Sequence, residues 1–247
     1  MMLNSRDLPF KYKVLNVFKL FKDLCDKKCN MTFFHFPSNF VYWENVSEHE
    51  KLKEMYLPKI RQMEKYTKDA LYYNGCTSVV NSSYSATNDN KEYNYYLLDQ
   101  LLLSNVVWKP LDNMIEKVNN SKDMFNICAE NSVIRGCWYN TYDMDNFQEL
   151  HNHDTYPFEH NGKMYHPSFS VVYIINNDSN KNDTIFKIRG DMPFTPKGVE
   201  CKFDTSDESS IKEGTVMIFS SLLDHVVKPV KIPGRTTIIY NIFSTYQ

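Results

Sequence analysis

The chain has 247 residues, of which 42% are hydrophobic and 15% are aromatic. This length and composition allow a sizeable buried core, and we expect one globular unit. The formal net charge is −2, with acidic and basic residues interspersed, which argues against non-specific binding to the phosphate backbone of nucleic acids.

The first 24 residues contain no apolar run long enough to cross a bilayer, and lysines interrupt the apolar core that a signal peptide requires. We therefore expect no membrane partner and a cytoplasmic location, the host cytoplasm if the protein is viral. The six cysteines are widely scattered, which favours reduced thiols over a disulfide framework.

Residues 1–125 are predicted to be mostly helical. The stretch Ser47-Glu-His-Glu50 has the form of a capping box, and apolar residues then recur at helical spacing as far as Leu71. Pro58 should bend or interrupt this helix because proline lacks a backbone hydrogen-bond donor. A further helix should begin at Trp108-Lys-Pro110.

Residues 81–94 are rich in Ser and Asn and are predicted to form a loop. No Gly/Pro/Ser-rich linker separates residues 1–125 from residues 126–247, and the apolar runs of the first part need a partner surface. We therefore expect the helical region to pack on the second part as one structural unit.

From residue 125 onward, short β-branched and aromatic runs alternate with polar turns, a pattern typical of strands in a sandwich or barrel. The fold class expected is mainly β with α. The predicted strands are Phe125–Ala129, Gly136–Tyr142, Gln148–His153, Ser168–Asn176, Thr184–Ile188, Gly214–Ser220 and Arg235–Phe243.

The stretch Phe147-Gln-Glu-Leu-His-Asn-His-Asp154 contains two histidines separated by one residue. If this stretch is extended, His151 and His153 project their imidazoles to the same side, which is a chelating geometry. For an isolated pair of this kind, polar residues on an outward face are the favoured interpretation, so a third ligand is needed to favour a metal site.

His225 supplies that third candidate, because it follows a buried-looking strand, Val216–Phe219, in a small turn. Two neighbouring ligands and a third from a distant strand can occupy one face of a metal and leave the other positions open for substrate and oxygen. For the remaining histidines we favour surface or structural roles: His35, His49, His160 and His166.

Arg235 begins a predicted strand directly after Gly234, which suits a tight turn, and Thr237 should face the same way as Arg235. An arginine in an apolar interior needs an anionic partner, and a carboxylate can pair with it through two parallel hydrogen bonds. The sequence leaves open whether that partner is a protein Asp or Glu or a bound ligand.

The order of these motifs resembles the iron(II)/2-oxoglutarate-dependent oxygenases, in particular those common in tailed-phage genomes. The resemblance covers about residues 135–243 and is carried by Trp138–Asn140, Phe147–His153, Ser168–Ile174, Gly214–His225 and Arg235–Asn241.

The resemblance implies a double-stranded β-helix, or jelly roll, with His151 and His225 as ligands of Fe(II). It implies that Arg235, helped by Thr237, holds the distal carboxylate of the cosubstrate 2-oxoglutarate. It also implies that O2 is consumed and that an organic substrate, a small molecule or a protein side chain, is hydroxylated.

Two features depart from the family pattern. Most such oxygenases have Asp or Glu two residues after the first ligand, where this chain has His153, so either His153 or the adjacent Asp154 is the second ligand. We favour His153, because strand alternation places Asp154 on the opposite face unless a bulge intervenes. The stretch Asp154–Tyr165 is a predicted insertion that could cover the substrate as a lid.

Two rival interpretations remain. In a cupin-type jelly roll, His151, His153, Glu159 and His225 would hold the metal and 2-oxoglutarate would not bind. In a non-catalytic jelly-roll module for binding or structure, the histidines would be incidental.

Overall fold

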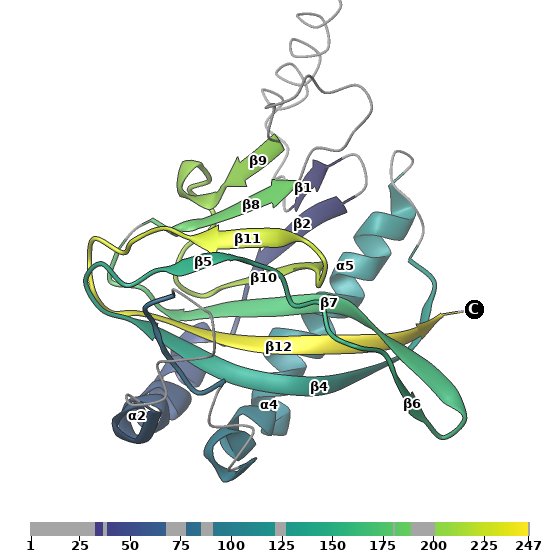
Figure 1. Cartoon of the computed structure of the whole chain (residues 1–247), viewed down its shortest axis with the longest axis horizontal. Helices are drawn as coiled ribbons and strands as arrows, with labels where there is room; N and C mark the ends of the chain where they lie inside the picture. Colours follow the sequence, from purple (N-terminus) through teal and green to yellow (C-terminus); the bar gives the residue numbers. More distant parts are fainter. Residues whose placement is uncertain are drawn as a thin grey trace, which may run out of the picture. The chain divides into compact units, whose positions relative to one another are not determined.

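The computed structural model describes residues 33–36, 39–67, 78–84, 91–121, 127–179, 181–188 and 201–246. Two antiparallel sheets form a jelly roll, and helices pack against the larger sheet (Figure 1). The fold class predicted from the sequence, mainly β with α, is confirmed.

The larger sheet has eight strands, all of them antiparallel to their neighbours. Its order is β1 (Phe33–Phe36), β2 (Asn39–Asn45), β10 (Thr215–Ser220), β7 (Lys163–Asn176), β12 (Arg235–Tyr246), β4 (Ala129–Tyr142) and β3 (Asn81–Ser82), with β6 (Phe158–His160) paired to β7 alone. The four-stranded sheet has the order β5 (Gln148–His151), β11 (Asp224–Val227), β8 (Thr184–Ile188) and β9 (Cys201–Asp204).

Helical segments precede most of the strands in the chain. They are α2 (His49–Thr67), the 3₁₀ helix η1 (Lys91–Leu98), α4 (Gln100–Leu103), the π-helical turn η2 (Ser104–Trp108) and α5 (Lys109–Asn120), and a short 3₁₀ helix, η3 (Thr205–Asp207), follows β9. Among the described residues, no helix is long and apolar enough to cross a membrane.

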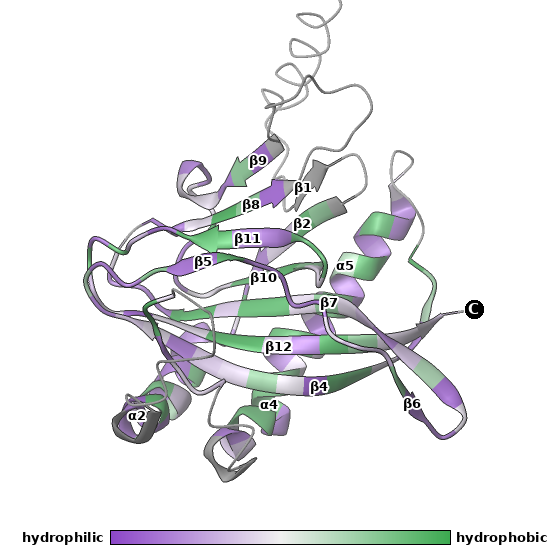
Figure 2. Cartoon of the chain, in the orientation of Figure 1, coloured by the Kyte–Doolittle hydropathy of each residue, from purple (hydrophilic) through white to green (hydrophobic). Residues whose placement is uncertain are grey.

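One core cluster joins the helices to the larger sheet. Leu52 of α2 and Met114 of α5 are fully buried in it together with Ile238, Tyr240 and Ile242 of β12. Hydrophobic and hydrophilic positions alternate along α5, so one face of this helix can supply the contact (Figure 2). The Tyr240 hydroxyl also donates a hydrogen bond of 2.8 Å to the backbone oxygen of Leu97.

A second core cluster lies between the two sheets. It contains Val172 of β7, Met217 and Phe219 of β10, Phe186 of β8 and Ile239 of β12. Because Ile239 belongs to this cluster and its neighbours Ile238 and Tyr240 belong to the helix-side cluster, the middle of β12 is buried on both faces.

The prediction for residues 1–125 was incomplete, since β1, β2 and β3 lie within that range. In β2, the run Phe40–Trp43 is buried on both faces, with Phe40 and Tyr42 in the helix-side cluster and Val41 and Trp43 between the sheets. A strand buried on both faces lacks the alternation by which strands are recognised. The division of the chain near residue 125 stays a prediction.

Two local predictions in this range also differ from the structure. Pro58 lies inside α2, so the helix is not interrupted there, whereas a bend at Pro58 stays a prediction. Leu71, the expected end of this helix, lies outside the described residues. Of the predicted loop 81–94, Asn81 and Ser82 pair with β4 as β3, and residues 91–94 belong to η1. The pairing of β3 is a contact with a distant strand, which local composition does not report.

Several strands after residue 125 match the predicted strands more closely. The strand Thr184–Ile188 coincides with β8, and β10 and β12 begin within a residue of the predicted positions. The strand expected at Phe125–Ala129 is absent from its described part except for Ala129, and β5 ends at His151 and not at His153. The sequence did not predict β6, β9 or β11, each of which has four residues or fewer.

Cys128 and Cys137 are free thiols, as expected for reduced cysteines. For the other cysteines, Cys25, Cys29, Cys76 and Cys201, the side chains lie outside the described part of the structure.

A mutation in α5 tests the contact between the helices and the sheet. Met114→Ala removes a fully buried side chain from the cluster shared with β12 and should lower the free energy of unfolding by about 2–5 kcal/mol. Glu116→Ala, an exposed position two residues along the same helix, is the control and should change it by less than about 0.5 kcal/mol. Equal effects in urea unfolding would show that α5 does not stabilise the folded sheet.

Candidate metal and anion site

One cavity between the two sheets gathers most of the predicted site residues. Side chains of His151, His153, His225, Arg235 and Thr237 all line it. The rest of the lining is Asn140, Tyr142, Gln148, Val172, Thr184, Phe186, Met217, Phe219, Val227 and Ile239.

The three histidines come from the smaller sheet and the segment that follows it. His151, the last residue of β5, is the cross-strand partner of His225 in β11. His153 lies two residues beyond β5, and its backbone N–H donates a hydrogen bond of 2.8 Å to the oxygen of Ser221. The strands thus supply two of the imidazoles directly, and this backbone contact holds the third beside them.

The imidazole rings form a compact triangle. The ring centroids of His151 and His225 lie 4.2 Å apart, those of His153 and His225 5.0 Å apart, and those of His151 and His153 5.5 Å apart. One ring nitrogen from each histidine lies within 4.8 Å of the other two, which is close enough for one metal ion.

Two of the rings are oriented by backbone oxygens. Nδ1 of His151 lies 2.7 Å from the oxygen of Glu149, and Nδ1 of His225 lies 3.0 Å from the oxygen of Leu223. A carbonyl oxygen can only accept, so each Nδ1 carries the hydrogen of the neutral ring and each Nε2 keeps its lone pair. This is the usual arrangement of histidines that bind a metal through Nε2.

Burial keeps the three imidazoles neutral. It lowers the pKa of His151 and lowers that of His225 well below the usual value. It also lowers the pKa of His153 to about 3, with a further contribution from repulsion by His151. Because these pKa values lie below the usual value of a free imidazole, the rings are in the deprotonated form that binds metals at neutral pH.

The carboxylates considered as alternative ligands lie apart from this triangle. Asp154 is exposed, does not belong to the three-histidine group, and its backbone N–H donates to the side-chain oxygen of Asn152. Glu159, the fourth ligand of the cupin interpretation, is an exposed residue of β6 and does not belong to the group either.

Arg235 is buried, with 2% of its surface exposed, at the start of β12. Its Nη2 donates a hydrogen bond of 3.0 Å to Oγ1 of Thr184, and its guanidinium lies 4.7 Å from the centre of the Tyr142 ring. Nε and Nη1 have no hydrogen-bond partner. No described carboxylate is within ion-pair distance of Arg235, although its charge acts on Asp183 and opposes the rise that burial causes in the pKa of that carboxyl. A buried cation with two free donors, beside the buried hydroxyl of Thr237, is suited to an anion.

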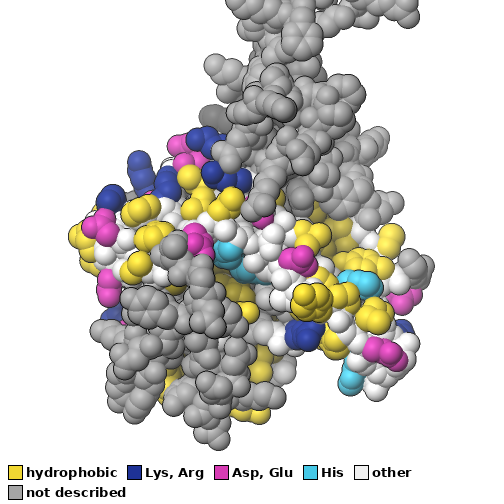
Figure 3. Space-filling model, in the orientation of Figure 1, with side chains coloured by type: hydrophobic (Ala, Val, Ile, Leu, Met, Phe, Trp, Pro, Cys, Tyr) yellow, Lys and Arg dark blue, Asp and Glu magenta, His cyan; other side chains and the backbone are white. Residues whose placement is uncertain are grey.

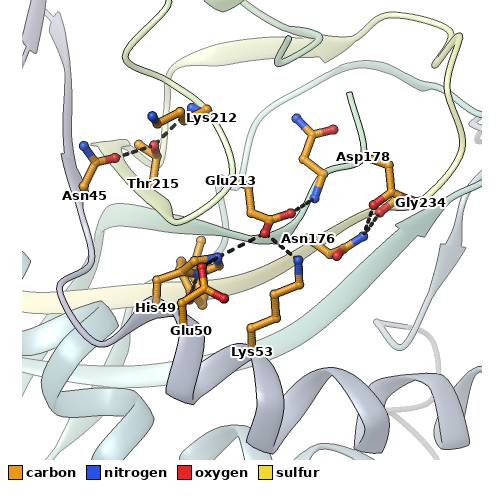
Figure 4. A network of polar contacts seen from close by, with 12 residues as sticks. Asn45, His49, Glu50, Lys53, Asn176, Asp178, Lys212, Glu213, Thr215 and Gly234 are labelled. Atoms are coloured by element: carbon orange, nitrogen blue, oxygen red, sulfur yellow. Dashed lines mark hydrogen bonds and ion pairs between the residues drawn. The ribbon is translucent and has the colours of Figure 1, made fainter. Parts of the chain in front are cut away.

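The turn that delivers Arg235 is tightly packed (Figure 4). Gly234 has a φ of +100°, and a Cβ at this position would lie 2.0 Å from Oδ2 of Asp178. The side-chain amide of Asn176 donates hydrogen bonds to the oxygen of Gly234 and to Asp178. Only glycine fits this turn without moving Asp178, so the expected role of Gly234 has a steric cause.

A second group of possible metal ligands comprises His49, Glu50 and Glu213 (Figure 4). The Glu213 carboxylate of this group already has protein partners. It accepts hydrogen bonds from Lys53 and from the backbone N–H of Asn177, and it contacts His49. These bonds lower the pKa of Glu213 against the effect of its burial. The group ties the start of α2 to the larger sheet, since Nδ1 of His49 also contacts the hydroxyl of Tyr173 in β7, and a structural role for His49 stays our prediction.

The predicted insertion Asp154–Tyr165 forms a hairpin of β6 with the start of β7 (Figure 1). An open groove of about 740 Å³ lies along it and includes Asp154, Lys163, His166 and Leu222. Hydrophobic and charged side chains mix in this part of the surface (Figure 3). His160 and His166 are exposed here and belong to neither group of possible metal ligands, whereas the side chain of His35 lies outside the described residues.

Sequence reasoning missed several polar residues of the site. Asn140 and Tyr142 line the cavity from β4, and the amide oxygen of Gln148 accepts hydrogen bonds from both of them. Ser170 of β7 contacts His153 from within the same interior. Alternation along β4 and β7 could have placed them on the interior face, but nothing local distinguishes them from other polar residues in strands.

No protein-family model matches the chain, and comparison with curated proteins gave no match. Among solved structures, chains of 2-oxoglutarate/iron(II) oxygenases are similar to it. HygX from Streptomyces hygroscopicus with nickel, 2-oxoglutarate and hygromycin B bound is 11% identical, with 82% of each chain covered and a TM-score of 0.49.

A prolyl-4-hydroxylase from Pseudomonas putida is 12% identical, with 84% of this chain and 92% of that chain covered and a TM-score of 0.43. A 2OG-Fe(II) oxygenase family protein from Burkholderia pseudomallei is 20% identical over 62% of this chain and 56% of that chain, with a TM-score of 0.35. The specific resemblance to phage oxygenases stays a prediction.

Replacing Gly234 tests the turn before Arg235. Gly234→Ala should lower the free energy of unfolding by more than Gly162→Ala, because both glycines have positive φ but only Gly234 also faces a steric overlap. The backbone strain alone costs on the order of 1–3 kcal/mol in either variant. Thermal and urea unfolding of both variants provide the comparison, and equal losses would mean that Asp178 moves aside without cost.

Proposed function

We propose that the protein is an Fe(II)/2-oxoglutarate-dependent oxygenase that hydroxylates an organic substrate. One observation carries this proposal: a single cavity is lined by three neutral imidazoles and by a buried guanidinium with two free donors. The first feature is suited to a transition metal, and the second to the carboxylate of a ligand that also reaches the metal.

His151, His153 and His225 would hold the metal. Imidazole nitrogen is a good ligand for iron, and three ligands on one face leave the remaining positions open. When bound there, Fe(II) would supply the capacity to activate O2 and to accept oxygen ligands from 2-oxoglutarate. The neutral state of the three rings favours this, since no proton has to leave before the metal binds.

Arg235 would bind the distal carboxylate of 2-oxoglutarate. Its free Nε and Nη1 can donate two parallel hydrogen bonds to the two carboxylate oxygens. Thr237, the next residue on the same face of β12, could donate a third. Binding of this anion would also remove the cost of leaving the buried guanidinium unpaired.

The surrounding side chains would exclude water from the reacting centre. Phe186, Phe219 and Ile239 line the cavity and belong to the core between the sheets. An apolar wall around a polar centre strengthens the electrostatic contacts inside it and protects reactive species from water. The groove along the β6–β7 hairpin would then be the approach for the substrate, with the hairpin as the lid anticipated from the sequence.

The cupin alternative, a metalloprotein without 2-oxoglutarate, is less well supported. It assigns Glu159 to the metal, and this residue is exposed on β6 outside the three-histidine group. The cupin alternative also provides no ligand for the unpaired donors of Arg235.

Removal of one histidine tests the metal site. His225→Ala leaves two of the three proposed ligands and should weaken anaerobic Fe(II) binding by at least tenfold, as is typical when a site loses a supporting group. His160→Ala changes an exposed histidine outside the group and should leave Fe(II) affinity unchanged. If the two variants bind Fe(II) as tightly as the parent, His225 is not a ligand.

Replacement of Arg235 tests the cosubstrate site separately. Charge-assisted hydrogen bonds contribute about 1.5–3 kcal/mol each, so Arg235→Ala should weaken 2-oxoglutarate binding by at least tenfold in the presence of Fe(II). Arg235→Lys keeps the charge but loses the planar pair of donors and should recover only part of the affinity. Fe(II) binding should survive in both.

The matched control is Arg135→Lys, at an exposed arginine, which should leave 2-oxoglutarate affinity unchanged. Anaerobic calorimetric titration measures all four proteins. Absence of 2-oxoglutarate binding by the parent, or equal affinity in all variants, would favour the cupin alternative.

A further inference from the structure

His153 differs from the other two histidines of the triangle in what its Nδ1 contacts. The Nδ1 atoms of His151 and His225 face backbone oxygens, whereas Nδ1 of His153 lies 2.7 Å from Oγ of Ser170. A carbonyl oxygen can only accept, but a serine hydroxyl can accept or donate. The contact with Ser170 therefore leaves two tautomers of neutral His153 open, and only one of them has a free lone pair on Nε2.

The position of Asn241 favours one of these tautomers. Ser170 and Asn241 are directly opposite each other in β7 and β12, and the Ser170 hydroxyl lies 3.4 Å from Oδ1 of Asn241. Ser170 is fully buried and Asn241 is 8% exposed, so water does not compete freely for either. A hydroxyl has one hydrogen, and if Asn241 accepts it, Oγ of Ser170 must accept from Nδ1–H of His153.

We propose that Ser170 and Asn241 are positioning residues that hold the ring hydrogen of His153 on Nδ1 and so leave Nε2 available to a metal ion. The chain Nδ1–H of His153 to Oγ of Ser170 to Oδ1 of Asn241 replaces the backbone oxygen that serves the other two histidines. Without the acceptor at Asn241, the hydroxyl is free to donate to Nδ1, which moves the ring hydrogen to Nε2 and removes the third ligand.

The inference rests on the proposed metal site, but its first test needs no metal. Nitrogen-15 NMR of histidine-labelled, metal-free protein distinguishes the two neutral tautomers of each ring. The parent should show hydrogen on Nδ1 for all three site histidines. Asn241→Leu, which removes the acceptor at similar size, should move the hydrogen of His153 to Nε2 and leave His151 and His225 unchanged as internal controls.

Asn241→Ala serves the same purpose if leucine does not fit. Because the tautomer is read without iron, this result is independent of whether the protein proves to be an oxygenase. An unchanged His153 tautomer in both Asn241 variants, or hydrogen on Nε2 in the parent, would overturn the inference.

The second test is metal affinity, measured anaerobically with Fe(II) in competition with a chelator. Loss of an orienting partner typically costs about 10–100-fold in metal affinity, and we expect a loss in this range for Asn241→Leu. The decisive variant is Ser170→Ala combined with Asn241→Leu, because it also removes the hydroxyl that donates to the wrong ring nitrogen. The double variant should bind Fe(II) more tightly than Asn241→Leu alone.

A role limited to packing would give the opposite result, with the two substitutions adding their losses. That outcome would overturn the inference while leaving the metal site intact. If the parent itself binds no Fe(II), the proposed function fails, and the NMR result alone decides whether Ser170 and Asn241 orient His153.

Discussion

The site depends on one constraint, the two-residue repeat of a strand that is buried on both faces. Along β12, Ile238 and Tyr240 face the helices, while Arg235, Thr237 and Ile239 line the cavity between the sheets. The same strand therefore anchors the helical layer and carries the proposed anion site. A shift of one residue in its register would exchange the two sets, placing the arginine in the helix-side core.

The interior between the sheets combines polar groups with an apolar wall. Burial keeps the imidazoles uncharged, whereas the guanidinium of Arg235 stays buried with two donors unpaired. A buried charge with unpaired donors is costly, and the large core on either side of β12 can offset that cost. A bound dianion that chelates a divalent metal, as proposed above, would satisfy both ends of the cavity.

Local sequence patterns indicate some residues of the site and not others. The histidine pair, His225 and Arg235 stood out because alternation and turn chemistry place them, and the structure brings them into one cavity. The two-sided burial of β2 hid that strand, and short β11 was overlooked although it carries His225. The roles of Ser170 and Asn241 depend on strand pairing across 71 positions, which no local pattern reveals.

The most direct test is an anaerobic crystal structure with Fe(II) and 2-oxoglutarate. Our account predicts one iron with Nε2 of His151, His153 and His225 at about 2.0–2.3 Å, by analogy with other metal–imidazole bonds. It also predicts a 2-oxoglutarate carboxylate on Nε and Nη1 of Arg235. Iron bound by Asp154 in place of His153, iron elsewhere, or an Arg235 that remains unpaired with 2-oxoglutarate present would contradict it.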